Sequence, residues 1–208
     1  ELHVWVNPFR ARHFKAESPD AATHVSQTRP ELVREYAKYL WLDPGEAEAQ
    51  EHSLRVILDI VKRYDVDGVH IDDYFYPYPE AKKDFPDEPS WNRYVSGEHA
   101  SGRSPMTRPD WRRDNINRFV ERMYREVKAA KGWVRVGVSP FGIWRPGNPE
   151  GVKGFDAFAG LYADARLWMR QGWMDYAAPQ LYWALDAKEQ PYRALLDWWR
   201  GQWGEDAS

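Results

Sequence analysis

Four short apolar runs, separated by longer stretches of helical periodicity, constrain the fold more than any other feature of this sequence. The runs are rich in Val and aromatic residues, are bounded by Gly or Pro, and cover residues 2–7, 68–73, 134–140 and 175–182. We interpret them as buried strands. Strands that alternate with helices predict right-handed βαβ units around a parallel sheet, either an open doubly wound sheet or a (β/α)8 barrel.

The helical stretches carry recognisable start and stop signals. The clearest begins at Asp43-Pro44-Gly45-Glu46, where a capping box with Pro at the first helical position is expected. A second is predicted from about Trp111, capped by Asp110 and ended by Gly132. Two more are predicted near residues 160–171 and around residues 195–199, and residues 77–109 are predicted to form a long loop with some local structure.

Composition excludes several classes of protein and of site. The 29 Lys and Arg nearly balance the 32 Asp and Glu, for a net charge of −3 without a basic block, which argues against nucleic-acid binding. The sequence has no apolar run near ~18 residues, so no membrane span is expected. Cysteine is absent, which rules out disulfides and thiolate ligands, and residues 1–7 read as a strand rather than a signal peptide.

Strand alternation assigns polar side chains to one inner face. If Val69 and Ile71 face outward, then His70 and Asp72 face inward, and the same rule applies to the other three runs. The inward polar residues nearest the carboxyl ends of the strands are then Asn7, Asp72, Ser139, Gln180 and Tyr182. We expect them to converge, because barrels and open α/β sheets alike place their sites at that end. Arg112 and Arg113, which start the helix after 68–73, are expected near the same mouth.

Aromatic residues make up 15% of the chain and gather after the predicted strands. Flat rings beside carboxylates and amides suit a sugar, which offers apolar C–H faces and a rim of hydroxyls. Tyr76, Trp144 and Tyr182 are candidates for stacking on a sugar or, equally, for packing. His70 is expected to be a hydrogen-bonded barrel residue.

Six sequence blocks, spread in order over nearly the whole chain, resemble the glycosyl-hydrolase-like family 10, also known as uncharacterised-domain family 187. The blocks are residues 2–10, 42–45, 67–77 (Asp67-Gly68-Val69-His70-Ile71-Asp72-Asp73-Tyr74-Phe75-Tyr76-Pro77), 111–115, 139–145 and 178–183. Phe9 stands where the family commonly has Tyr. A weaker likeness is to family 18 chitinases, but Tyr74 stands at the position of their acidic Glu, so that mechanism does not carry over.

This resemblance implies a (β/α)8 TIM barrel, of which residues 1–208 would be a single domain carrying strands three to six, and a fragment of a longer barrel. It implies a glycoside hydrolase of the bacterial cell envelope or exterior, with peptidoglycan strands as the polysaccharide substrate. No cofactor, metal or oligomeric state is indicated. The residues expected to bind substrate are Asn7, Arg10, His70, Tyr74, Tyr76, Ser139, Trp144, Gln180 and Tyr182.

Glycoside hydrolysis usually needs two carboxyl groups, ~5–5.5 Å apart for retention and ~6.5–9.5 Å for inversion. Asp72 is the first candidate, because it points inward at a strand end. Asp73 is the second, although alternation turns it to the opposite side unless the chain bends at Tyr74. The acid could instead be Asp114, Glu98, Asp186 or a residue outside this chain. The runner-up function is a non-catalytic glycan-binding domain, and an open-sheet protein for another ligand comes third.

Overall fold

The computed structural model describes residues 1–81 and 83–203. Its centre is a parallel sheet of four strands in the order β1-β5-β6-β7. These strands are β1 (His3–Val6), β5 (Gly68–Ile71), β6 (Arg135–Val138) and β7 (Tyr176–Ala177). Each lies within one of the four predicted runs. The fourth strand is much shorter than the run predicted for it, because the pairing beyond Ala177 continues through a single bridge between Phe141 and Gln180. The chain therefore has an α/β fold with a parallel sheet.

The strand register places one residue from each of the four strands in a single row. Trp5 pairs with His70, His70 with Gly137, and Gly137 with Tyr176. β1 and β7 stand at the two ends of the strand order, so within the described residues the sheet is an arc with open edges.

Two long helices cover the outer face of the sheet, which carries Val69, Ile71, Val136 and Val138. They are α2 (Ala47–Arg63) and α4 (Arg108–Ala130), and they contact each other. Their apolar stripes, which include Leu54, Ile57, Phe119 and Val120, are fully buried against the strands. Alternating strands and amphipathic helices thus produce the predicted layered arrangement.

The helix starts differ from the predicted ones. α2 begins three residues after Pro44, with Glu46 in the capping position, because the Asp43 carboxylate accepts the Gly45 N–H and turns into the core instead of capping the helix. α4 begins at Arg108 rather than Trp111, and its cap is Thr107, whose hydroxyl accepts the Asp110 N–H.

The stretch near 160–171 divides into α5 (Ala157–Gly160) and α6 (Ala165–Arg170), and α7 (Tyr192–Arg200) follows near the C-terminus.

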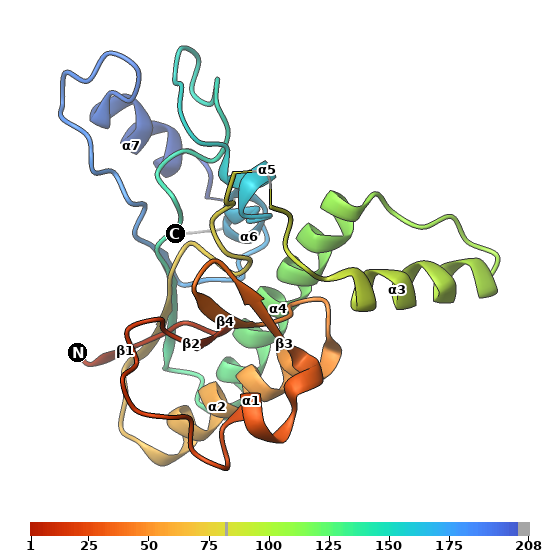
Figure 1. Cartoon of the computed structure of the whole chain (residues 1–208). Coiled ribbons are helices and arrows are strands. Elements are labelled where there is room, and N and C mark those ends of the chain that lie inside the picture. The colour runs from red at the N-terminus through yellow and green to blue at the C-terminus, as the bar shows by residue number, and fades with distance from the viewer. Residues whose placement is uncertain (82, 204–208) are drawn as a thin grey trace.

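The two long connections carry structure that periodicity did not predict. Between β1 and α2, a three-stranded antiparallel sheet in the order β2-β4-β3 is built from Arg10–Arg12, Tyr39–Leu42 and Val33–Tyr36, with α1 (Val25–Thr28) and the 3-10 helix η1 (Pro30–Leu32) between β2 and β3. Between β5 and α4, the predicted loop contains α3 (Glu88–Ala100), which projects from the body of the molecule (Figure 1).

Candidate active site

A continuous line of hydrogen bonds runs across the inner face of the parallel sheet. The Tyr176 hydroxyl lies 2.7 Å from His3 Nδ1 and 2.9 Å from His70 Nδ1, and His70 Nε2 lies 2.6 Å from the Ser139 hydroxyl. Burial lowers the pKa of His70, which favours the neutral ring. Both ring nitrogens of His70 are thus engaged within the protein, which suits a positioning role better than direct contact with a substrate.

The line depends on Gly137, which lies in β6 between His70 and Tyr176. A Cβ at this position would come within 2.0 Å of Tyr176 Cζ. The missing side chain lets the Tyr176 ring lie across β6, at 5.6 Å and 23° to the His70 ring.

Asp72 follows β5 directly, and its half-buried carboxylate faces the same side of the sheet. Gln180 Nε2 donates to Asp72 Oδ1 at 2.9 Å and to the Ser139 carbonyl at 3.0 Å. Three of the residues predicted to converge are therefore in contact at the carboxyl ends of neighbouring strands.

Asp73 turns to the other side of the chain and is only 3% exposed. The Tyr78 hydroxyl donates to its Oδ2, and its backbone N–H donates to Asp72 Oδ1 at 3.1 Å. Burial raises the pKa of Asp73 to about 6; the Tyr78 bond opposes this shift, and the neighbouring Asp72 charge adds to it. Two adjacent carboxyl groups therefore occupy contrasting environments.

A second polar group forms where β1 passes into β2. Arg10 Nη1 donates to the Tyr74 hydroxyl at 2.9 Å, and the Arg10 N–H donates to Asn7 Oδ1 at 2.9 Å. The Arg10 guanidinium carbon is 5.8 Å from the ring centroids of both Trp5 and Tyr74, and half of Trp5 is exposed. Asn7, Arg10 and Tyr74 thus form one cluster, beside the strand that precedes Asp72.

Three predicted substrate contacts lie elsewhere. Tyr76 is 1% exposed and packs edge-on against Phe85 and Tyr162, so its ring belongs to the core and its assignment to sugar binding is corrected. Trp144 is stacked on Trp198 and donates from Nε1 to Asp164, which explains its position by packing. Tyr182 is 85% exposed and has left the strand pairing, so alternation no longer directs it to the inner face.

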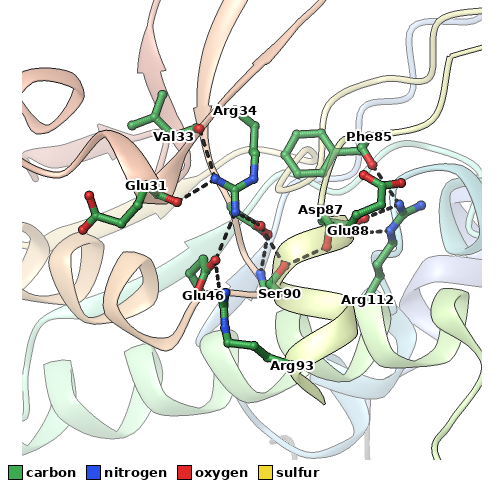
Figure 2. Close-up of polar contacts among 12 residues, drawn as sticks. Glu31, Val33, Arg34, Glu46, Phe85, Asp87, Glu88, Ser90, Arg93 and Arg112 are labelled. Carbon is green, nitrogen blue, oxygen red and sulfur yellow. Dashed lines mark hydrogen bonds and ion pairs between the residues drawn. The ribbon is translucent and has the colours of Figure 1, made fainter. Parts of the chain in front are cut away.

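The arginines expected at the mouth are buried instead. Arg112 Nε and Nη2 both donate to Asp87 at 2.7 Å (Figure 2). Its Nη1 donates to Asp84 at 2.8 Å. Figure 2 also shows Arg34 and Ser90, which contact Asp43. Burial raises the pKa of Asp43 to about 6. This network joins the segment before α3 to the start of α4, and it is structural.

The other proposed acids do not contact Asp72. Asp114 pairs with Arg118 along α4, Glu98 pairs with Arg103 at the end of α3, and Asp186 is exposed in the segment before α7. Within residues 1–81 and 83–203, no group of three His, Asp or Glu side chains is arranged to hold a metal ion. Sequence reasoning missed Tyr78, because its contact with Asp73 depends on a loop path that has no periodic signal.

The fold and the polar cluster around Asp72 define a class of protein. It is an α/β protein whose candidate site, with two Asp side chains, lies where the parallel strands end. Residues 3–205 match the family model described as Glycosyl hydrolase-like 10, and the chain belongs to that family. No helix in the described part of the chain is long and apolar enough to span a membrane.

Two curated relatives are named glycosyl hydrolases. Glycosyl hydrolase YngK of Bacillus subtilis (strain 168) is 37% identical over 97% of this chain and 40% of its own length. Glycosyl hydrolase DigH of Escherichia coli (strain K12) is 32% identical over 96% of this chain and 46% of its own length. The chain thus spans less than half the length of these relatives.

Similarity to solved structures is weak. An alpha-L-fucosidase isoenzyme 2 from Paenibacillus thiaminolyticus aligns with a TM-score of 0.40 and 12% identity over 59% of this chain and 19% of its own. A GH36 alpha-galactosidase, AgaA, from Geobacillus stearothermophilus aligns with a TM-score of 0.38 and 12% identity over 96% of this chain and 31% of its own. The family assignment therefore depends on sequence.

Proposed function

We propose that this chain carries the catalytic face of a glycoside hydrolase that cleaves O-glycosyl bonds by carboxyl acid/base catalysis. One observation carries the proposal: Asp72 and Asp73 are adjacent at the end of β5, one facing the inner side with an amide donor, the other enclosed with its pKa raised to about 6. Paired carboxyl groups in contrasting environments are what acid and base roles require.

In this proposal Asp72 acts as the nucleophile or as the stabiliser of the oxocarbenium-like transition state. Gln180 fixes the orientation of its carboxylate, and Ser139 fixes Gln180 through its carbonyl. Asp73 holds the proton for the leaving oxygen. Because Tyr78 covers Asp73 and is itself 43% exposed, movement of the Tyr78 side chain would open the acid to the substrate.

The proposed substrate is a bacterial cell-wall glycan, with peptidoglycan strands as the specific class and the cell envelope or exterior as the place of action. Family membership and the polar, aromatic character of the inner face support it. We further propose that the four parallel strands are strands three to six of a (β/α)8 barrel, which would be completed beyond β1 and β7 in a longer protein. The in-order parallel arrangement is consistent with such an arc.

The decisive experiment incubates the full-length protein with peptidoglycan glycans lacking stem peptides and identifies the products by mass spectrometry. Asp72→Asn should reduce turnover by at least about a hundredfold, because the amide can neither attack nor stabilise positive charge. Asp59→Asn is the matched control, since Asp59 is exposed on α2 and pairs with Arg63 on the helix surface. Full turnover in Asp72→Asn would refute the mechanism.

The 3% exposure of Asp73 favours one alternative, a glycan-binding domain without turnover. That function predicts that wild type and Asp72→Asn bind the glycan equally and that neither yields cleaved product.

A further inference from the structure

A half-buried guanidinium without a carboxylate partner lies beside the candidate site. Arg34 and Arg112 are also withdrawn from solvent, and each of them pairs with a carboxylate. Arg10 is half-buried too, but it pairs with no carboxylate of residues 1–81 and 83–203. Because a guanidinium keeps its positive charge, the charge of Arg10 is not compensated within this part of the chain.

The nitrogen atoms of Arg10 are only partly used. Nη1 donates to the Tyr74 hydroxyl at 2.9 Å, whereas Nε and Nη2 make no hydrogen bond to the described residues and are not enclosed by them. The guanidinium carbon lies 5.8 Å from the ring centroids of Trp5 and Tyr74. Rings that face a guanidinium leave its in-plane N–H groups available, and those groups match the two oxygens of a carboxylate.

The Tyr74 hydroxyl is a second unused donor. Its oxygen accepts from Arg10, and within the described residues no acceptor takes its hydrogen. Burial raises the pKa of Tyr74; the Arg10 charge opposes this rise and the Asp72 charge adds to it, so the hydroxyl keeps its proton. Tyr74 is therefore within electrostatic reach of Asp72, two residues earlier in the chain.

Arg10 and Tyr74, which we call the donor pair, thus present N–H and O–H donors together with one positive charge. A sugar hydroxyl both donates and accepts, and it carries no charge that could balance Arg10. A carboxylate only accepts and carries the opposite charge. The chemistry of the donor pair therefore matches an acidic sugar better than a neutral one.

We propose that the donor pair binds a carboxylate of the glycan close to the bond cleaved at Asp72, and that this contact selects acidic over neutral glycans. The inference rests on the proposed function and deepens it, because it names the substrate class as a carboxylate-bearing glycan. The lactyl ether of a peptide-free peptidoglycan strand and a uronic acid both supply such a carboxylate.

The test measures kcat/KM of the full-length protein on peptide-free peptidoglycan strands and on the same strands after reduction of their carboxylates to primary alcohols. The ratio of native to reduced substrate should be about ten or more in wild type, because hydrogen bonds between charged groups are the strong ones. In Arg10→Gln the ratio should fall toward unity, mainly through KM. Arg10→Lys should keep part of it, because the charge remains without the planar fork.

Two further variants complete the comparison. Tyr74→Phe removes one neutral donor and should lower the ratio about two- to fivefold. Arg125→Gln is the matched control, because Arg125 is exposed on α4, where it pairs with Glu121, and its ratio should equal that of wild type. A wild-type ratio close to unity, or a ratio unchanged in Arg10→Gln, would overturn the inference.

A binding measurement identifies the source of the carboxylate. Calorimetric titration of Asp72→Asn with soluble native and reduced strands needs no turnover, and adding Arg10→Gln should remove the preference for native strands. A glycan of alternating N-acetylglucosamine and glucuronic acid is the third ligand. If it binds in an Arg10-dependent way, the donor pair accepts uronic acids as well; if only the native strands do, it accepts the lactyl ether.

The same measurements separate this inference from the proposed function. If wild type hydrolyses no glycan but binding still prefers the carboxylate through Arg10, the hydrolase proposal fails and the donor pair is supported. If hydrolysis occurs with the same ratio of native to reduced substrate in wild type and Arg10→Gln, the donor pair fails and the hydrolase proposal is supported.

Discussion

At the scale of single residues, the contact between Tyr78 and Asp73 sets the protonation of the proposed acid. The donated hydrogen bond stabilises the Asp73 carboxylate and so opposes the rise in its pKa caused by burial. In Tyr78→Phe we expect the pKa of Asp73 to rise, so the alkaline limb of the pH–rate profile moves to higher pH by up to about one unit. Tyr124→Phe, which removes a remote hydroxyl near Asp175, should leave the limb in place. A limb that moves to lower pH would contradict the role of Asp73.

The raised pKa of Asp73 also makes stability depend on pH. Because the folded state binds this proton more tightly than the unfolded chain, its contribution to stability is full below about pH 4 and is lost as pH rises through about 6. Asp73→Asn cannot titrate, so over that interval its free energy of unfolding should fall less than that of the wild type. The difference between the two falls should be about 3 kcal/mol at most. Denaturant titrations at pH 4, 5, 6 and 7 measure this, with Asp59→Asn as an exposed control. If the free energy of unfolding changed with pH in the same way in wild type and Asp73→Asn, the raised pKa of Asp73 would be contradicted.

At the scale of elements, β6 depends on a residue without a side chain. A Cβ at Gly137 would meet the Tyr176 ring at 2.0 Å, inside a sheet where neither strand can shift freely. Gly137→Ala should lower the free energy of unfolding by about 1–3 kcal/mol. Gly132→Ala is the matched control, because the nearest atom to its Cβ would be 3.8 Å away. Equal denaturation midpoints for the two variants would show that the ring relaxes without cost.

Sequence periodicity predicted the four parallel strands and the long helices because apolar residues recur at fixed spacing where an element buries one face. Inward placement of Asp72, Ser139 and Gln180 followed from alternation, which persists a short way past the strand ends, as far as the bridge at Gln180. The rule failed at Tyr182, which follows that bridge. Tyr76 was predicted only from the gathering of aromatic residues after the strand, which does not distinguish packing from binding. The helix boundary at Asp43 was wrong because a buried ionic network, invisible to local spacing, drew that carboxylate away from the cap. The β2-β4-β3 sheet was missed because Arg10–Arg12 and Val33–Tyr36 contain charged residues and do not form an apolar run.

At the scale of the whole molecule, the arc of four strands leaves two edges, at β1 and β7. If a barrel is completed beyond these strands, their outward-pointing amides are hydrogen-bonded to further strands. Hydrogen exchange on the full-length protein should then show amides in His3–Val6 as slow as those in Gly68–Ile71. Rapid exchange confined to β1 and β7 would indicate an open sheet and refute closure.

The buried Arg112 has a mechanical consequence for the proposed chemistry. Its guanidinium fastens Asp84 and Asp87, in the connection that also carries Tyr78, to the first turns of α4. The main chain that follows Tyr78 is therefore anchored to α4, and the opening of Asp73 falls to the Tyr78 side chain. A substitution that shifts α4, far from any bound sugar, would therefore also affect Tyr78, the residue that admits or excludes the ligand.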